Sequence, residues 1–332
     1  MSDYRQYRSQ RTINQNSIVV KNVPQYLLSL KTKPASLIFA GLMVFLINPQ
    51  LPTPPVQPEP ILRPISFSLP DPSPYPVNSG VKPPYISARF VYALDIPSKT
   101  TIYIKNPDEK MRPASTTKIM TALVAMESLR SNTVVTSPKT TEAIGKTIKL
   151  KSGEQIGFDD MLYALLLESG NDVAFALAEN YAGGYTKMVE DMNLKAKKLG
   201  MENTLFKNVS GLDQYQHETT AHDMAILASE AIRIPLFAEI VSTKQKEIKT
   251  VDGNIIHQLK NTNELLGIVE GVKGIKTGLT DLAGENLITL VDRNGHQIII
   301  GLFGSQDRFG ETKKVIEWIF SNHNWEFPPL TH

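Results

Sequence analysis

One serine–lysine pair in the chain has a setting that could make the serine a nucleophile. Ser115 and Lys118 lie three residues apart in the stretch PASTTKIM, and on a helix this spacing places both side chains on one face. A serine hydroxyl attacks poorly until a neighbouring base accepts its proton. A lysine can be that base only when burial or a nearby cation lowers its pKa. The apolar Ile119 and Met120 beside it indicate such burial.

The S-x-x-K spacing alone is a weak signal, because a chain of this size should hold roughly one by chance. A second such tetrad runs from Ser79 to Lys82. It stands in a proline-rich stretch where no helix could align the two side chains. The other candidate residues must therefore decide whether Ser115 reacts.

Two polar side chains flank Gly170 in the stretch ESGNDVA. The pattern predicts a short joint between two helices, with Ser169 and Asn171 in it. A hydroxyl here could relay a proton, and an amide could orient the lysine and a substrate. Simple helix capping is the alternative, since serine and asparagine both suit it.

The stretch GIKTGLT places Lys276, Thr277 and Gly278 on a predicted strand. The lysine and threonine could bind a substrate carboxylate through charge and hydroxyl. Without a side chain, Gly278 would let a substrate backbone lie against the strand edge. The alternative is an exposed edge strand protected from aggregation by its lysine. The triplet K-T-G occurs once in the chain, and so does S-x-N.

The order of elements that must position these residues predicts an α+β domain. Strands come first, then a block of helices, then three strands and a closing helix, so an antiparallel sheet is built from both ends of the chain and an all-helical lobe is inserted. The helices are expected at 114–130, 159–169, 172–182, 184–200, 219–233 and 311–323, two strands within 86–106, and three more at 272–280, 285–291 and 296–305.

Taken together, three motifs in this order and setting are specific, and the chain resembles the serine D-alanyl-D-alanine carboxypeptidases. These are low-molecular-mass penicillin-binding proteins of peptidase family S11, with a β-lactamase/transpeptidase-like domain. The resemblance extends to the stretches RPASTTKIMTAL, LLLESGNDVAFALAE, MNLKAKKLGMENTLFKNVSGLD, NTNELL and GIKTGLTDLAGENLITLV, and covers about Ile86 to Phe320.

The resemblance implies a role for each matching residue. Ser115 would be the acylated nucleophile and Lys118 its base, and Ser169 would pass a proton to the departing D-alanine. Asn171 would help to fix lysine and substrate. The remaining matches imply substrate binding: Lys276 and Thr277 hold the terminal carboxylate, Gly278 admits the substrate backbone, and the amides of Ser115 and Leu279 form the oxyanion hole.

Two positions depart from the family pattern. His222 stands in the stretch TTAHD where an arginine is usual, which puts one carboxylate contact in doubt because histidine is not always charged. Asn286 stands where cysteine is frequent in AGENL, with no catalytic effect expected.

Composition excludes several other classes of function. A net charge of +2 argues against a nucleic-acid partner, and the absence of cysteine removes thiolate catalysis and cysteine-ligated metals. The stretch HETTAH places His217 and His222 at i and i+5, about 140° apart on a helix, so it does not form the zinc motif H-E-x-x-H. No metal and no cofactor are expected.

The N-terminal region predicts a membrane protein whose catalytic domain lies outside the cytoplasm. Residues 1–34 read as a basic cytoplasmic tail and 35–51 as a transmembrane signal-anchor containing the apolar run Ala35 to Ile47. A cleaved signal peptide is the alternative, although no A-x-A-like site follows. The proline-rich 52–84 would be a semi-rigid spacer, or plain disorder, and 85–328 the catalytic domain.

The expected activity is removal of the terminal D-alanine from peptidoglycan stem peptides through a Ser115 acyl-enzyme, with β-lactams as inhibitors. A D,D-endopeptidase acting on peptide cross-links would use the same chemistry on a longer substrate. A β-lactamase would need a second base to hydrolyse its acyl-enzyme, for which no convincing residue is found. A non-catalytic penicillin-binding module is the alternative from another class, and the intact Ser115, Lys118, Ser169 and Lys276 argue against it.

Overall fold

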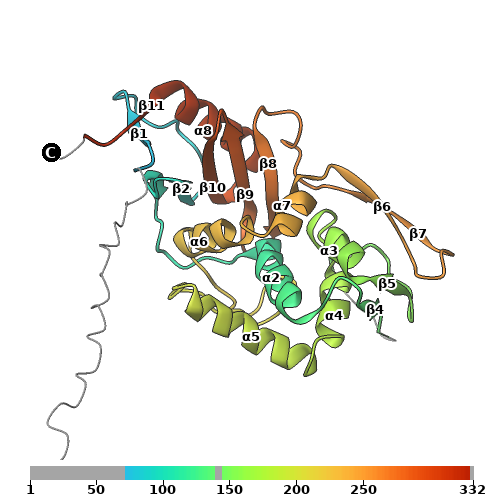
Figure 1. Ribbon diagram of the computed structural model, residues 1–332. Helices are drawn as coiled ribbons and strands as arrows, with labels where there is room; N and C mark the ends of the chain where they lie inside the picture. The colour runs from blue at the N-terminus through green and yellow to red at the C-terminus, as the bar shows by residue number, and fades with distance from the viewer. Residues whose placement is uncertain (1–71, 139–143, 330–332) are drawn as a thin grey trace, which may run out of the picture. The chain divides into compact units, whose positions relative to one another are not determined.

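The computed structural model describes residues 72–138 and 144–329. There, a five-stranded antiparallel sheet with the order β3-β2-β10-β9-β8 joins strands from both ends of the chain (Figure 1). This arrangement confirms the predicted α+β class. The strands are β2 (Phe90–Asp95), β3 (Thr101–Lys105), β8 (Val272–Thr280), β9 (Gly284–Arg293) and β10 (His296–Ser305).

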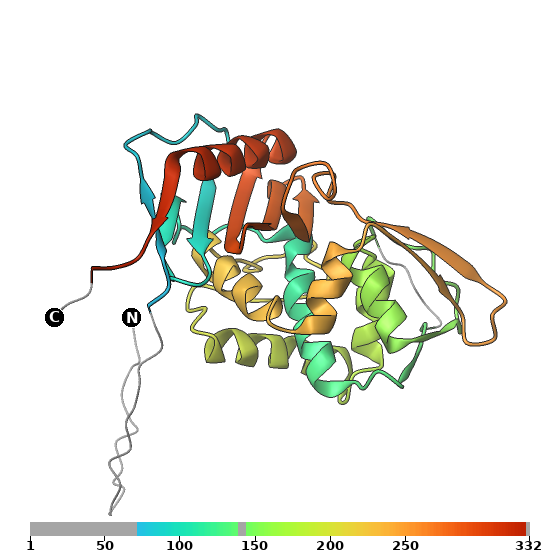
Figure 2. The same cartoon turned by 45° about the horizontal axis from the view of Figure 1, so that its top comes forward.

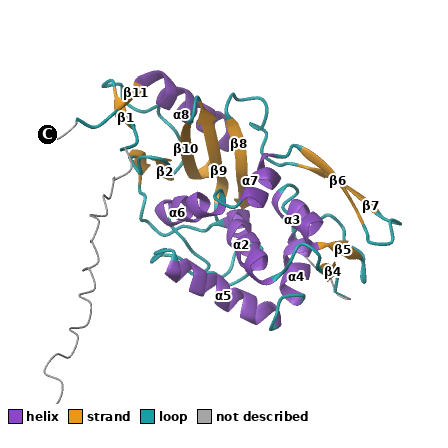
Figure 3. Ribbon diagram, in the orientation of Figure 1, coloured by secondary structure: helices purple, strands orange, loops and turns teal. Residues whose placement is uncertain are grey.

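Helices cover both faces of the sheet. α8 packs on one face against β9 and β10, whereas α6, α7 and the 3₁₀ turn η1 contact the sheet from the other side (Figures 1 and 2). The remaining helices form the inserted lobe, which Figure 3 separates by colour from the strands. The helices are η1 (Ala114–Thr117), α2 (Lys118–Ser128), α3 (Phe158–Leu166), α4 (Asn171–Glu179), α5 (Gly184–Lys198), α6 (Ala221–Ala231), α7 (Pro235–Ser242) and α8 (Arg308–Asn322).

The sheet separates two apolar cores, and β9 contributes to both. Its alternate residues point to opposite faces, so Ile288 and Leu290 join the core shared with the lobe, while Leu287 and Val291 join the core under α8. α2 runs through the first core with eight of its residues buried. The nucleophile motif is therefore attached to a helix that lies largely inside the core.

Most predicted elements are confirmed, with local differences. The hairpin between β9 and β10 turns at Asn294 and Gly295, both with positive φ (56° and 84°), as a two-residue primed turn requires. The predicted helix 114–130 begins instead as the 3₁₀ turn η1. α7 was not expected, although Pro235 stands at its first turn, a common start signal.

Three two-stranded ribbons were also not expected. They are β1 (Tyr75–Asn78) with β11 (His323–Glu326), β4 (Val134–Thr136) with β5 (Gln155–Gly157), and β6 (Gln245–Lys249) with β7 (Ile256–Lys260).

The expected domain start at residue 85 is too late. β1 pairs with β11, and the Trp318 indole N–H donates to Val81 O at 3.1 Å. The expectation that 52–84 is a semi-rigid spacer or disordered is thus wrong for its last part, which contains β1. A two-stranded ribbon tolerates Pro76 because no further strand needs its missing N–H. The predicted tail 1–34 and anchor 35–51 lie outside the described residues.

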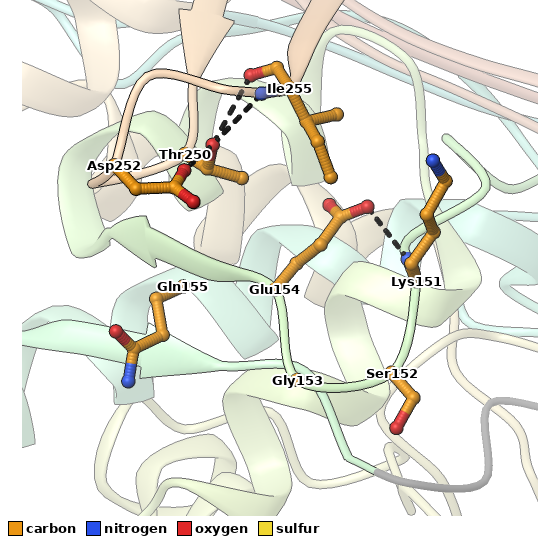
Figure 4. A pocket seen from close by; sticks show the side chains of 8 residues that line it. All are labelled: Lys151, Ser152, Gly153, Glu154, Gln155, Thr250, Asp252 and Ile255. Carbon is orange, nitrogen blue, oxygen red and sulfur yellow. Dashed lines mark hydrogen bonds between the residues drawn. The ribbon is translucent and has the colours of Figure 1, made fainter.

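The β6–β7 hairpin packs against the helical lobe next to β5. The Val251 N–H donates to Gln155 O at 2.8 Å, and Glu154 pairs with His257 at 2.9 Å. A hollow of about 280 Å³ lies at this junction (Figure 4), where the Glu154 carboxylate also accepts a hydrogen bond from the Lys151 amide. None of the residues that line it belongs to the three sequence motifs, so the hollow is a feature of the hairpin contact.

Candidate active site

The S-x-x-K pair is brought together by the 3₁₀ turn that precedes α2. A 3₁₀ helix has three residues per turn, so side chains at i and i+3 eclipse one another. Ser115 lies in η1 and Lys118 is the first residue of α2, and their Oγ and Nζ atoms are 3.1 Å apart. The predicted proximity is confirmed, with a tighter turn as its cause.

The Lys118 amine has three oxygen partners. Nζ donates to Asn171 Oδ1 at 2.7 Å and to the Ser210 carbonyl at 2.6 Å, and Ser115 Oγ is the third. The first two are pure acceptors, so they occupy two N–H groups of the amine. In a neutral lysine the remaining position is the lone pair, and it faces the Ser115 hydroxyl. The geometry therefore suits a lysine that accepts the serine proton.

The surroundings of Lys118 favour that neutral form. Its side chain is fully buried, and burial lowers its pKa to about 7, while the Asp172 carboxylate opposes part of this effect. Asp172 is itself held by the amides of Ile148 and Leu150 at 3.2 and 3.0 Å. A substantial fraction of Lys118 is consequently neutral near pH 7 and able to act as a base.

The S-x-N residues lie in the predicted joint between α3 and α4. Ser169 adopts φ = 65°, a left-handed conformation uncommon for residues other than glycine. Asn171 does not cap α4, since it donates through Nδ2 to Ile144 O at 2.6 Å and presents Oδ1 to Lys118. Capping is therefore the wrong explanation for Asn171, whose amide orients the lysine.

The K-T-G strand β8 forms the edge of the sheet, yet its lysine is buried. Lys276 is 1% exposed, and its Nζ donates to the Thr277 carbonyl at 3.2 Å. The alternative of an exposed lysine that protects the edge is thus wrong. The Thr277 hydroxyl lies 2.7 Å from that of Thr262, in the segment before β8.

Positive charge gathers around Lys276. Burial holds its pKa well below the ordinary value, and the cations Lys118, Lys146 and Arg308 push the same way, against the weaker opposing effect of Glu168. Each protonated cation here disfavours the others. An incoming carboxylate would relieve this repulsion, which makes the cluster a site for an anionic group.

Gly278 is required by the packing of β8 on η1. A Cβ at this position would lie 3.1 Å from Ala114 Cβ and 3.2 Å from Ser115 N, closer than most real contacts. The strand itself approaches the nucleophile turn through this glycine, in addition to any approach by substrate. Leu279 follows with its side chain 59% exposed.

Two participants were missed by sequence reasoning. The Ser210 carbonyl binds Lys118, and a backbone group leaves no signal in the residue type. Arg308 donates to Gly278 O at 3.1 Å, but it begins a helix far along the chain. Asn286, for which no catalytic effect was expected, has a structural contact: it is fully buried and donates to the carbonyls of Arg112 and Pro113, so it holds the segment that enters η1.

The position of His222 settles whether it replaces an arginine at the carboxylate site. It stacks on Tyr92 and pairs with Asp108 at 3.1 Å, beside β2 and three strands away from β8. The expectation that it replaces a carboxylate-binding arginine is therefore wrong, and the arginine beside the K-T-G strand is Arg308. The other histidine of HETTAH, His217, contacts Thr117 instead, so the two do not share a site.

Comparison with known proteins agrees with this geometry. Residues 78–307 match the family model described as D-alanyl-D-alanine carboxypeptidase. The chain is 35% identical over 231 residues to the D-alanyl-D-alanine carboxypeptidase DacF of Bacillus subtilis, which covers 67% of this chain and 59% of DacF. It thus spans less than two thirds of that relative's length.

Two other comparisons bear on the fold and the reaction. A D-alanyl-D-alanine endopeptidase of Pseudomonas aeruginosa is 32% identical over 225 residues, covering 66% of this chain and 72% of that protein. The crystal structure of the Streptomyces K15 DD-transpeptidase superposes with a TM-score of 0.68 at 30% identity, covering 73% of this chain and 100% of that one. The predicted transpeptidase-like fold is confirmed.

The environment of Lys118 predicts how Ser115 should respond to pH and to substitution. Acylation of Ser115 by penicillin should rise with pH through about 7, because Lys118 accepts a proton only after losing its own. Lys118→Arg keeps the positive charge but cannot lose its proton in this range. Acylation should then fall by roughly 10²–10⁴. Stopped-flow measurement of adduct formation tests both.

Lys118→Arg is informative only when the variant folds, which near-wild-type thermal melting would establish. Near-normal acylation by a folded Lys118→Arg protein would contradict the assignment of Lys118 as base and leave it an electrostatic role only.

Proposed function

The chain belongs to the D-alanyl-D-alanine carboxypeptidase family, and from this premise we propose that it is a serine D,D-carboxypeptidase. Its substrate would be a peptidoglycan stem peptide that ends in D-Ala-D-Ala. One observation carries the proposal: a buried amine, Lys118, faces the Ser115 hydroxyl beside a second buried lysine, Lys276. Nucleophile, base and carboxylate site are thereby close together.

In the proposed first step, Ser115 Oγ attacks the carbonyl carbon of the penultimate D-alanine and Lys118 takes the hydroxyl proton. Negative charge develops on the carbonyl oxygen, where the amide N–H groups of Ser115 and Leu279 would stabilise it. The C–N bond then breaks, and the departing amine of D-alanine receives a proton that Ser169 passes on from the lysine. Asn171 keeps Lys118 in place throughout.

The second step hydrolyses the acyl-enzyme and regenerates the free Ser115 hydroxyl. A water molecule, losing its proton to Lys118, attacks the ester carbonyl of the acyl-enzyme, and Ser115 Oγ leaves and regains a proton. The products are a shortened peptide and free D-alanine. A β-lactam would acylate Ser115 by the same first step. Its ring nitrogen would be the leaving group, and it would remain part of the acyl chain bound to Ser115.

The terminal carboxylate would be held by Lys276 and Thr277, with Arg308 nearby. Burial and the neighbouring cations disfavour the charged form of Lys276, and an anionic ligand would offset that cost. This electrostatic demand supports a substrate whose last residue is a free acid. A D,D-endopeptidase remains the second candidate, supported by the endopeptidase relative, since a cross-linked peptide carries the same type of bond.

A two-part experiment tests the proposed activity. A fluorescent penicillin should label the wild-type protein, and mass spectrometry should place the adduct on the peptide that bears Ser115. D-alanine should be released from a pentapeptide ending in D-Ala-D-Ala, and Ser115→Ala should lose both reactions. An adduct on Ser79, or no adduct at all, would count against the proposal.

The same preparation separates the alternatives. Cleavage of a cross-linked muropeptide dimer without release of D-alanine would identify an endopeptidase. Rapid turnover of the penicillin would identify a β-lactamase, and a stable adduct with no peptide hydrolysis a non-catalytic penicillin-binding module.

Lys276→Ala tests the carboxylate site. Loss of a charged hydrogen bond is worth roughly 1.5–3 kcal/mol, so kcat/KM should fall by about one to two orders of magnitude on a peptide with a free D-alanine carboxylate. The matched C-terminal amide should lose far less, because it brings no charge to the site. An equal loss on acid and amide would show that Lys276 is structural.

We further propose that residues 35–51 anchor the protein in the cell membrane, with the catalytic domain outside the cytoplasm. Within 72–138 and 144–329, no helix is both long and apolar enough to cross a bilayer, so the proposal rests on the apolar run of the N-terminal region and its basic flank. Deletion of residues 1–49 should move the active protein from membranes to the soluble fraction. Maturation of the full chain to a shorter secreted form would instead identify a cleaved signal peptide.

A further inference from the structure

The peptide unit that joins Ala114 to Ser115 carries two groups of consequence. Its N–H belongs to Ser115 and is the proposed oxyanion donor, and its carbonyl belongs to Ala114. The unit is planar, so the direction of the carbonyl fixes the direction of the N–H. Ala114 also adopts φ = 48°, in the left-handed region that a residue other than glycine enters only at an energetic cost. Surrounding groups must therefore hold this conformation.

Two glycines pack against this peptide unit, and a side-chain hydrogen bond is made to its carbonyl oxygen. Gly211 lies against it so closely that a Cβ there would fall 1.9 Å from Ala114 O, and Gly278 approaches Ser115 N from β8. The Thr117 hydroxyl then donates to Ala114 O at 2.8 Å. A hydroxyl has only one hydrogen, so Thr117 Oγ1 can only accept from its other partner.

That other partner is His217, whose Nε2 lies 2.9 Å from Thr117 Oγ1. The opposite ring nitrogen, Nδ1, accepts from the Lys207 backbone N–H at 2.9 Å. Because a backbone N–H can only donate, Nδ1 carries no hydrogen and the proton of the neutral ring sits on Nε2. The four groups form one chain of donors: Lys207 N–H to His217, His217 to Thr117, and Thr117 to Ala114 O.

The two side chains of this chain of hydrogen bonds are shielded from water. Thr117 is 0% and His217 2% exposed, and the ring packs edge-on against Phe206, while the outer hydrogen bond from the Lys207 N–H is partly buried. Burial, with the positive charge of Arg112, lowers the pKa of His217 to about 4, which keeps the ring neutral at ordinary pH. In a dry site a fully satisfied chain of this kind is rigid.

We propose that His217 is a positioning residue which, through the Thr117 hydroxyl, aims the Ser115 N–H at the developing oxyanion. The inference rests on the proposed acyl-transfer function and adds to it a residue outside the three motifs. His217 touches neither substrate nor nucleophile. Its effect is on the orientation of the peptide that stabilises negative charge.

The test uses Thr117→Val and His217→Phe, which remove the hydroxyl and the ring nitrogens with little change of shape. Removal of a whole oxyanion donor costs about 10²–10³ in rate, so misalignment should slow penicillin acylation by roughly 10- to 100-fold. His217→Gln, which can place an amide N–H near the Nε2 position, should recover part of the rate. Thr121→Val is the matched control one turn further along, in α2. Its buried hydroxyl donates to Val209 O at 2.7 Å and to the backbone carbonyl of Thr117 at 3.4 Å, so the substitution leaves the Thr117 hydroxyl and His217 in place.

A second readout separates positioning from general destabilisation. The ester carbonyl of the acyl-enzyme, followed by infrared spectroscopy with a ¹³C-labelled penicillin, should shift to higher frequency in Thr117→Val and His217→Phe, because its hydrogen bonds weaken. The double variant should be no slower than Thr117→Val alone, since both act through one chain. Thermal melting reports how much of each variant is folded.

Two results would overturn the proposal. One is a folded Thr117→Val protein whose carbonyl band is unshifted and whose acylation rate is within about twofold of wild type, which is close to the error of additivity comparisons. If His217→Phe does not fold, Thr117→Val alone decides the test. The other is Thr121→Val with the same loss as Thr117→Val. Failure of the wild type to react with penicillin would instead overturn the proposed function, and this inference with it.

Discussion

The burial of the Lys118 amine among three oxygens is the constraint on which the site depends. An amine without exposed surface must satisfy its N–H groups inside the protein, and here Asn171 and Ser210 supply the acceptors from α4 and from the loop before α6. Both segments must pack onto α2 for this to happen. The helical lobe therefore fixes the base, and the depth at which it does so lowers the pKa of Lys118 to about 7.

A buried neutral base shapes the electrostatics around it. Lys276 lies close enough for the charge of Lys118 to lower its pKa, and Lys146 and Arg308 act in the same direction. Within the described part of the chain, Asp172 is the carboxylate that acts on Lys118, and it accepts hydrogen bonds from the amides of Ile148 and Leu150. Glu168 opposes the cations at Lys276 with the weakest of the effects that act there, so an anionic ligand would favour the charged form of this lysine.

Residue types and spacings predicted the parts of this site that lie on local structure. The i, i+3 spacing of Ser115 and Lys118, the joint with Asn171, and the strand with Lys276 all follow from periodicity and turn residues. The sequence does not reveal contacts that depend on tertiary packing. Ser210 acts through its carbonyl, so its side chain gives no sign, and Arg308 reaches β8 only because the sheet places α8 beside it. The pairing of β1 with β11 was not predicted because β1 contains a proline. Proline is excluded from central strands but is tolerated in edge strands.

The nucleophile turn is held from every element that meets it, and this explains residues with no role in the chemistry. Asn286 on β9 ties the carbonyls of Arg112 and Pro113 to the sheet, while its own oxygen accepts from Gly304 on β10. A buried amide with all these partners costs little to bury, whereas loss of one would leave unpaired groups beside a strained Ala114. Such strain persists only where the surroundings over-determine it. Sheet, lobe and the buried histidine each fix a different atom of one turn, so the accuracy of the site is a property of the whole domain.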